Sequence, residues 1–98
     1  MLSLDELKNL ISPIATELGL ERIIVFGSYA RGDCGESSDL DLIIDSGGKL
    51  KGKHLFSAIY KIDKIIPAKA DIFELSEVVN PSQTYSAILR EGVTIYER

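Results

Sequence analysis

The chain has 98 residues, 45% of them hydrophobic, which suits one compact domain with one core and is too short for two. Its formal charge of −4 argues against direct binding of nucleic acid, because non-specific affinity comes from Lys and Arg that neutralise phosphates. The apolar runs fall far below the ~20 residues that span a bilayer, and no leader pattern begins the chain, so we expect a cytoplasmic protein without membrane contact.

The N-terminal part predicts a helix followed by a strand. Ser3 and Glu6 form a capping-box pattern, and apolar residues at helical spacing then continue from about residue 4 to Leu18. Gly19 ends this helix, because glycine tolerates the positive φ of a helix C-cap. The short β-branched run 22–26 predicts a buried strand.

The middle of the chain predicts a polar connection between two strands. Residues 28–31 suit the first turn of a short helix, and the glycine-containing residues 32–38 have no periodicity and predict a loop. The single cysteine, Cys34, lies in this loop and cannot form an internal disulfide, which fits a reducing compartment. Residues 39–44 predict the second strand, and Asp45 begins a turn-rich break.

The C-terminal half predicts helix, strand, helix and strand. The first of these helices ends at Pro67, the next strand covers 70–75, a helix from Pro81 reaches Arg90, and 93–96 closes the chain as a strand. We therefore expect an α/β (α+β) fold with a twisted mixed sheet that carries helices. The side chains expected to face the core from the helix before Pro67 are Leu55, Phe56, Ile59, Tyr60, Ile62 and Ile66, and Phe73 is also expected at a core position.

Two carboxylates stand one residue apart at the start of the second strand. Side chains alternate between the faces of a strand, so Asp39 and Asp41 project to one side and Leu40 to the other. Two carboxylates held side by side repel unless a cation lies between them, and Mg²⁺ prefers one or two carboxylates plus substrate phosphates. The pair therefore predicts half of a metal–phosphate site.

Other residues supply candidates for the remainder of that site. Gly27 and Ser28 follow the first strand, where exposed backbone N–H groups and the serine hydroxyl can hold phosphate oxygens. Asp71 opens the third strand and adds a third carboxylate if that strand lies beside the second. The alternatives are ordinary: Ser28 could cap a helix, and an aspartate at the start of a strand is common.

These residues form a two-part motif that resembles a known family. Phe26-Gly27-Ser28, ten residues, and then Asp39-Leu40-Asp41-Leu42 is similar to the signature of the DNA polymerase β-like nucleotidyltransferase superfamily. The fuller pattern, in residues 27–32 and 38–42, most resembles its minimal (MNT) branch. The resemblance covers nearly the whole chain in the order of its predicted elements, and it implies the nucleotidyltransferase fold.

The resemblance also implies an activity and the residues that perform it. It implies a metal-dependent enzyme that transfers a nucleoside monophosphate, AMP from ATP in some members, to an acceptor hydroxyl with release of pyrophosphate. Asp39 and Asp41 would bind two Mg²⁺ ions, and Asp71 would share one ion and help deprotonate the acceptor. Gly27 and Ser28 would hold the triphosphate.

Three questions stay open at this point. Minimal members resemble the antitoxins of HEPN toxin pairs, so a HEPN partner is expected, and a second copy of the chain could instead complete the open cleft. The protein could neutralise its partner by binding alone, or transfer a nucleotide to a small molecule such as an aminoglycoside. Arg31 could contact a phosphate or form a surface ion pair.

A second glycine-rich stretch, residues 47–54, has the Gly-x₄-Gly-Lys spacing of a P-loop. His54 stands where that motif needs Ser or Thr to coordinate the metal, so a solvated turn with Lys49, Lys51 and Lys53 is the preferred interpretation, with His54 on the surface at a helix start.

Overall fold

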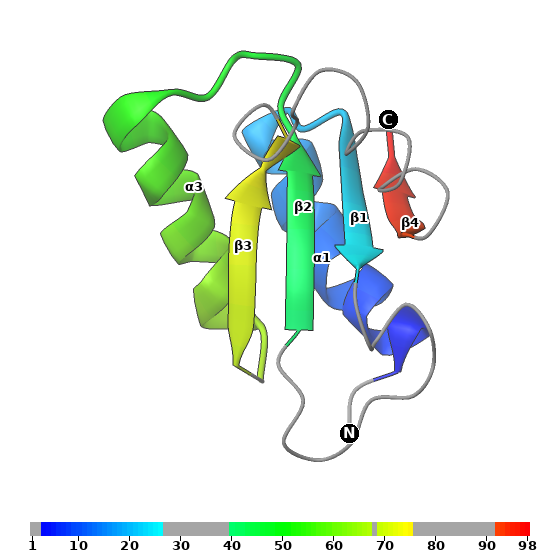
Figure 1. The fold of residues 1–98 in the computed structure, drawn as a ribbon. Helices are drawn as coiled ribbons and strands as arrows, with labels where there is room; N and C mark the ends of the chain where they lie inside the picture. The colour runs from blue at the N-terminus through cyan, green and yellow to red at the C-terminus, as the bar shows by residue number, and fades with distance from the viewer. Residues whose placement is uncertain (1–2, 27–39, 68, 76–91) are drawn as a thin grey trace.

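The computed structural model describes residues 3–26, 40–67, 69–75 and 92–98, and within them the predicted elements follow one another in the predicted order (Figure 1). The predicted helical turn at 28–31, the loop at 32–38 and the helix up to Arg90 lie outside the described residues. The described elements are α1 (Leu4–Leu18), β1 (Arg22–Phe26), β2 (Leu40–Asp45), α3 (Gly52–Ile65), β3 (Ala70–Glu74) and β4 (Val93–Glu97).

The four described strands form one mixed sheet in the order β3-β2-β1-β4. Strand β1 runs antiparallel to both β2 and β4, whereas β2 and β3 are parallel. Parallel neighbours need a long crossover, and α3 supplies it between β2 and β3. The predicted fold class, a mixed sheet with helices packed on it, is confirmed.

Helix α1 begins and ends where its sequence predicts. Ser3 Oγ accepts a hydrogen bond from the Glu6 backbone N–H, and Glu6 Oε1 accepts one from the Ser3 backbone N–H. This reciprocal pair satisfies two N–H groups that the first helical turn would otherwise leave without partners. Gly19 ends the helix with φ +70°, a left-handed conformation that residues with a Cβ adopt only at a cost.

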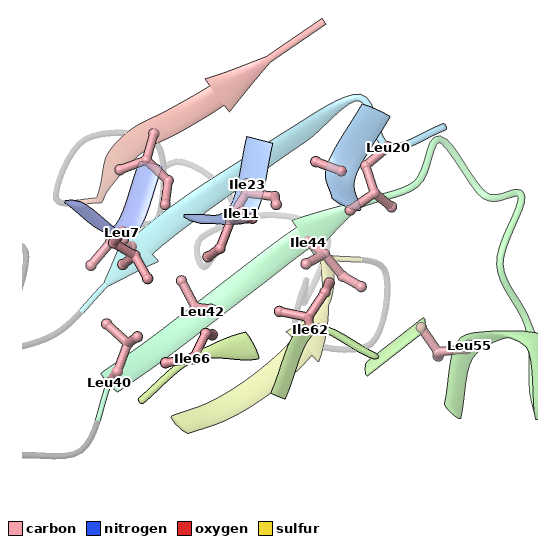
Figure 2. Close-up of a cluster of buried hydrophobic side chains, with 13 residues drawn as sticks. Leu7, Ile11, Leu20, Ile23, Leu40, Leu42, Ile44, Leu55, Ile62 and Ile66 are labelled. Carbon is pink, nitrogen blue, oxygen red and sulfur yellow. The ribbon is translucent and has the colours of Figure 1, made fainter. Parts of the chain in front are cut away.

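The two described helices, α1 and α3, pack on one face of the sheet, and the main core lies between these helices and the sheet (Figures 1 and 2). Alternate residues of β2 point into this core, as the period of a strand requires. Among the described residues, no helix combines the length and the hydrophobicity needed to cross a membrane. The fully buried members of this core include Leu7, Ile11, Ala15, Leu20, Ile23, Val25, Leu40, Leu42, Ile44 and Ile62.

The predicted burial of three aromatic side chains is wrong. Phe56 and Tyr60 are 72% and 58% exposed, and Phe73 is 43% exposed. On α3 the buried side chains are Leu55, Ala58 and Ile62, so the helix turns its aromatic stripe to the solvent. A helix turns about 100° per residue, so the two rings lie roughly 130° and 170° away from the direction that the three buried side chains share.

Candidate functional site

The candidate site centres on two carboxylates from neighbouring strands. In the parallel pairing of β2 with β3, Asp41 is the register partner of Asp71. Register partners in adjacent parallel strands project to the same face, and their backbones lie roughly 4.8 Å apart. The third strand thus lies beside the second, which is the condition on which a contribution of Asp71 to the site depended.

The alternation of burial shows which face these carboxylates occupy. Leu40 and Leu42, on either side of Asp41, belong to the main core, and Asp41 itself is only partly exposed. Ala70 and Ile72, on either side of Asp71, pack against the same core, whereas Asp71 is exposed. Both carboxylates therefore project from the sheet face opposite to the helices.

The end of β1 borders the same position. Phe26, the last residue of β1, is the antiparallel register partner of Asp41. Gly27 and Ser28 follow Phe26 in the sequence. The order across this end of the sheet is thus Asp71 on β3, Asp41 on β2 and the last residue of β1.

The donor set at this position fits a divalent cation. Two carboxylates on adjacent strands repel each other, and oxygen ligands of this kind are the ones that Mg²⁺ binds, usually together with substrate phosphates. Asp71 is solvent-exposed, so an ion and a polyphosphate can approach from outside the sheet. The arrangement can hold a metal–nucleotide complex beside Asp41 and Asp71, on the sheet face opposite to the helices.

Several predicted site residues fall outside the part of the chain that the structure describes. These are Gly27, Ser28, Arg31 and Asp39. Within the described ranges, no group of three His, Cys, Asp or Glu side chains comes together as a metal site. The described part of the predicted site is therefore the Asp41–Asp71 pair.

The P-loop-like stretch lies at the other end of the sheet. It follows the C-terminal end of β2, whereas Asp41 lies near the start of that strand. Lys49 Nζ forms an ion pair with Glu21 Oε1 at 3.2 Å, and His54 is exposed in the first turn of α3. These observations support a solvated turn.

An open pocket of about 350 Å³ also lies at this second end. Within it, Arg22 contacts Asp45 at 3.2 Å, and Arg98 contacts Glu21 at 3.7 Å. These ion pairs join the ends of neighbouring strands, at the end of the sheet away from Asp41. The lining residues of the pocket are Glu21, Arg22, Asp45, Gly47, Glu97 and Arg98.

Sequence reasoning missed the buried carboxylate of Glu74, which is 2% exposed. Its Oε1 accepts hydrogen bonds from the backbone N–H of Ser46 at 3.4 Å and from the Ser46 hydroxyl at 3.3 Å. The bonds join the end of β3 to the turn after β2. The available signal was the alternation of Ala70 and Ile72, which puts Glu74 on the core face of the strand.

The sequence matches a protein-family model, and its relatives share one activity class. Residues 8–98 match the model described as "Polymerase beta, Nucleotidyltransferase". A Methanocaldococcus jannaschii protein, MJ0435, whose name proposes a protein adenylyltransferase, is 29% identical over 80 residues, which cover 79% of this chain and 83% of the relative.

Solved structures share the fold at low sequence identity. One is a toxin–antitoxin complex with AMP-PNP, with a TM-score of 0.70 and 19% identity over 93% of this chain and 73% of that chain. Another is a tri-AMPylated Shewanella oneidensis HEPN toxin in complex with an MNT antitoxin, with a TM-score of 0.66 and 16% identity over 97% and 73% of the two chains. With the family match over residues 8–98 and the paired carboxylates on a mixed sheet, the chain belongs to the polymerase beta nucleotidyltransferase family.

Proposed function

We propose that this nucleotidyltransferase moves AMP from ATP to a hydroxyl group on a partner HEPN toxin, and that it thereby acts as an antitoxin. The observation that carries the proposal is the register pairing of Asp41 with Asp71 on the sheet face opposite to the helices, in a chain that belongs to this family. A nucleotide substrate is supported by the AMP-PNP in a toxin–antitoxin complex of the same fold.

The metal would be held by three carboxylates. Asp41 and Asp71 fit it by donor type and by position, and Asp39 is added because strand alternation predicts it on the same face as Asp41. When bound, two Mg²⁺ ions would neutralise the triphosphate charge and polarise the phosphoryl group that is transferred. Gly27, Ser28 and Arg31 are proposed to hold the triphosphate.

The chemical step is a substitution at the α-phosphorus of ATP. The acceptor hydroxyl oxygen forms a bond to the α-phosphorus while the bond from that phosphorus to the bridging oxygen breaks. Pyrophosphate leaves with the electron pair of the broken bond, and the hydroxyl proton passes to the carboxylate of Asp71. This residue suits the role because it is exposed beside Asp41, where an acceptor can reach it.

The choice of partner rests on a structural neighbour. In the complex of the same fold, an MNT antitoxin is bound to a HEPN toxin that carries AMP.

The reaction consumes ATP, so we also propose a cytoplasmic location, in accord with the absence of a membrane-spanning helix among the described residues.

The test uses α-³²P-ATP, because only the α-phosphate is retained in transferred AMP. The purified chain is mixed with the HEPN protein encoded nearest to it in its own genome, with Mg²⁺ or with EDTA. We expect label on the HEPN protein only with Mg²⁺, and none from γ-³²P-ATP. A stable complex that inhibits the HEPN protein without any label would overturn the enzymatic proposal in favour of neutralisation by binding.

A further inference from the structure

An exposed aromatic ring lies beside the candidate site. Phe73 is two residues after Asp71 on β3, so both side chains project to the sheet face opposite to the helices. The ring is 43% exposed, although its register partner Ile43 is buried. Ile43 belongs to a small apolar cluster with Ile24 and Leu75, against which Phe26 packs, and Phe73 is not a member of that cluster.

The position of β3 in the sheet separates this ring from the predicted phosphate site. Within the described sheet, β2 lies between β3 and β1. The predicted phosphate-binding residues follow β1, whereas Asp71, the proposed proton acceptor, is on β3. Two strand spacings amount to roughly 10 Å, so Phe73 lies on the side from which an acceptor hydroxyl would approach Asp71.

We propose that Phe73 binds the acceptor segment of the partner protein, by packing against an apolar or aromatic side chain next to the hydroxyl that receives AMP. The inference rests on the proposed function and adds a determinant of acceptor specificity. Two residues along a strand span roughly 7 Å, about the distance between a reacting side chain and the next side chain on the same face of an extended peptide.

Binding at Phe73 is favourable because an aromatic ring in contact with water is unfavourable in free energy. A phenylalanine ring that loses its contact with water on binding contributes favourably, and aromatic side chains supply much of the binding energy at protein interfaces. The ring also borders a carboxylate, so the surface combines apolar area with the group that takes the proton. Such a surface selects an acceptor hydroxyl with apolar surroundings over a free sugar or a solvated serine.

The test compares steady-state AMP transfer to the same HEPN protein by variants of one chain. We expect Phe73→Ala to raise KM for the HEPN protein about tenfold, the change that a loss of ~1.4 kcal/mol produces, with KM for ATP and kcat at saturating acceptor within twofold of wild type. Phe73→Tyr keeps the ring and should remain close to wild type.

The matched control is Phe56→Ala, which removes the same side chain from α3, where it is 72% exposed. This variant should leave both KM values unchanged. If Phe73→Ala does not fold, Phe73→Thr retains strand propensity and should give the same rise in KM for the acceptor.

Three results would overturn the inference. They are an unchanged acceptor KM for Phe73→Ala, a rise in KM for ATP instead, which would assign the ring to the nucleobase, and an equal defect in Phe56→Ala. Two further measurements in the same assay separate the levels: absence of transfer by the wild type would contradict the proposed function itself, and normal transfer by Asp41→Ala would contradict the site assignment. An inactive Asp41→Ala with an unaffected Phe73→Ala would contradict this inference alone.

Discussion

Two aspartates on one strand have register partners of opposite charge. Asp41 and Asp45 lie four residues apart on β2 and project to the same face. The register partner of Asp45 on β1 is Arg22, whose guanidinium contacts it through Nε at 3.3 Å and Nη2 at 3.2 Å. The register partner of Asp41 on β3 is a second acid, Asp71.

The difference separates a stabilising charge from one positioned for chemistry. An opposite charge at hydrogen-bonding distance stabilises the fold, whereas two like charges side by side destabilise it unless a ligand compensates. The end of the sheet that holds Arg22 and Asp45 therefore supports the structure, and the end that holds Asp41 and Asp71 is the candidate site.

The largest effect is expected for Asp41→Ala, which tests the difference between the two ends of the sheet most directly. We expect AMP transfer to fall by roughly 100-fold or more, the scale on which loss of one charge-stabilising group in an active site lowers kcat. The melting temperature is followed as well, so that a loss of transfer is read only from a variant that is folded. Transfer kinetics and thermal unfolding of the same sample measure both, and normal transfer by a folded variant would remove the metal role of Asp41.

The reciprocal change is Asp45→Ala, which makes the same truncation on the same strand face. It removes the contact with Arg22 and the hydrogen bond that Asp45 Oδ1 accepts from the Gly47 N–H at 3.0 Å. We expect a loss of about 1–2 kcal/mol in the free energy of unfolding, and hence a melting temperature lower by roughly 5–10 °C, with kcat retained below that transition. A loss of kcat in folded Asp45→Ala would show that this end of the sheet also contributes to AMP transfer.

A smaller effect is expected at the turn that follows β2. Ser46→Ala removes the hydroxyl that donates to Glu74 and accepts from the Leu50 N–H at 3.3 Å. The free energy of unfolding should fall by about 1 kcal/mol, as measured by urea denaturation. Ser12→Ala is the control, because its hydroxyl bonds only the exposed Lys8 carbonyl of its own helix, and an equal loss there would contradict a specific role for the turn.

The smallest effect concerns a third acid with a local structural partner, Glu6. Hydrogen bonds with Ser3 lower the pKa of Glu6 from its usual value of 4.5. Because the pKa of Glu6 is lower in the folded state, its carboxylate contributes to the stability of the fold above the unfolded pKa. This contribution is lost as the pH falls through the folded pKa. The difference in melting temperature between wild type and Glu6→Gln should therefore shrink as the pH is lowered below 4.5, and a difference that grows instead would contradict the capping role.

Much of the fold could be predicted because its signals are local. The capping box at Ser3, the left-handed C-cap at Gly19 and the β-branched run of β1 each report on a few consecutive residues, and the structure confirms all three. Strand β2 was predicted to end one residue early, at Ile44, because Asp45 resembles a turn residue until its arginine partner across the strand is known.

The exposure of aromatic side chains was predicted poorly because it depends on how a helix lies on the sheet. Phe56 and Tyr60 stand four residues apart, a helical spacing, and their size suggested burial. The buried side of α3 instead follows Leu55, Ala58 and Ile62. The rotation of α3 about its own axis decides which side chains face the sheet, and it cannot be predicted from the local sequence.

What the sequence by itself determined is the set of elements, the two-part glycine–serine and aspartate motif, and the family that this motif resembles. What only the tertiary structure decided is that Asp71 stands beside Asp41 while Arg22 stands beside Asp45. The physical reason is that periodicity defines the faces of each strand, whereas the neighbour of a strand depends on the α3 crossover and on the packing of the whole sheet.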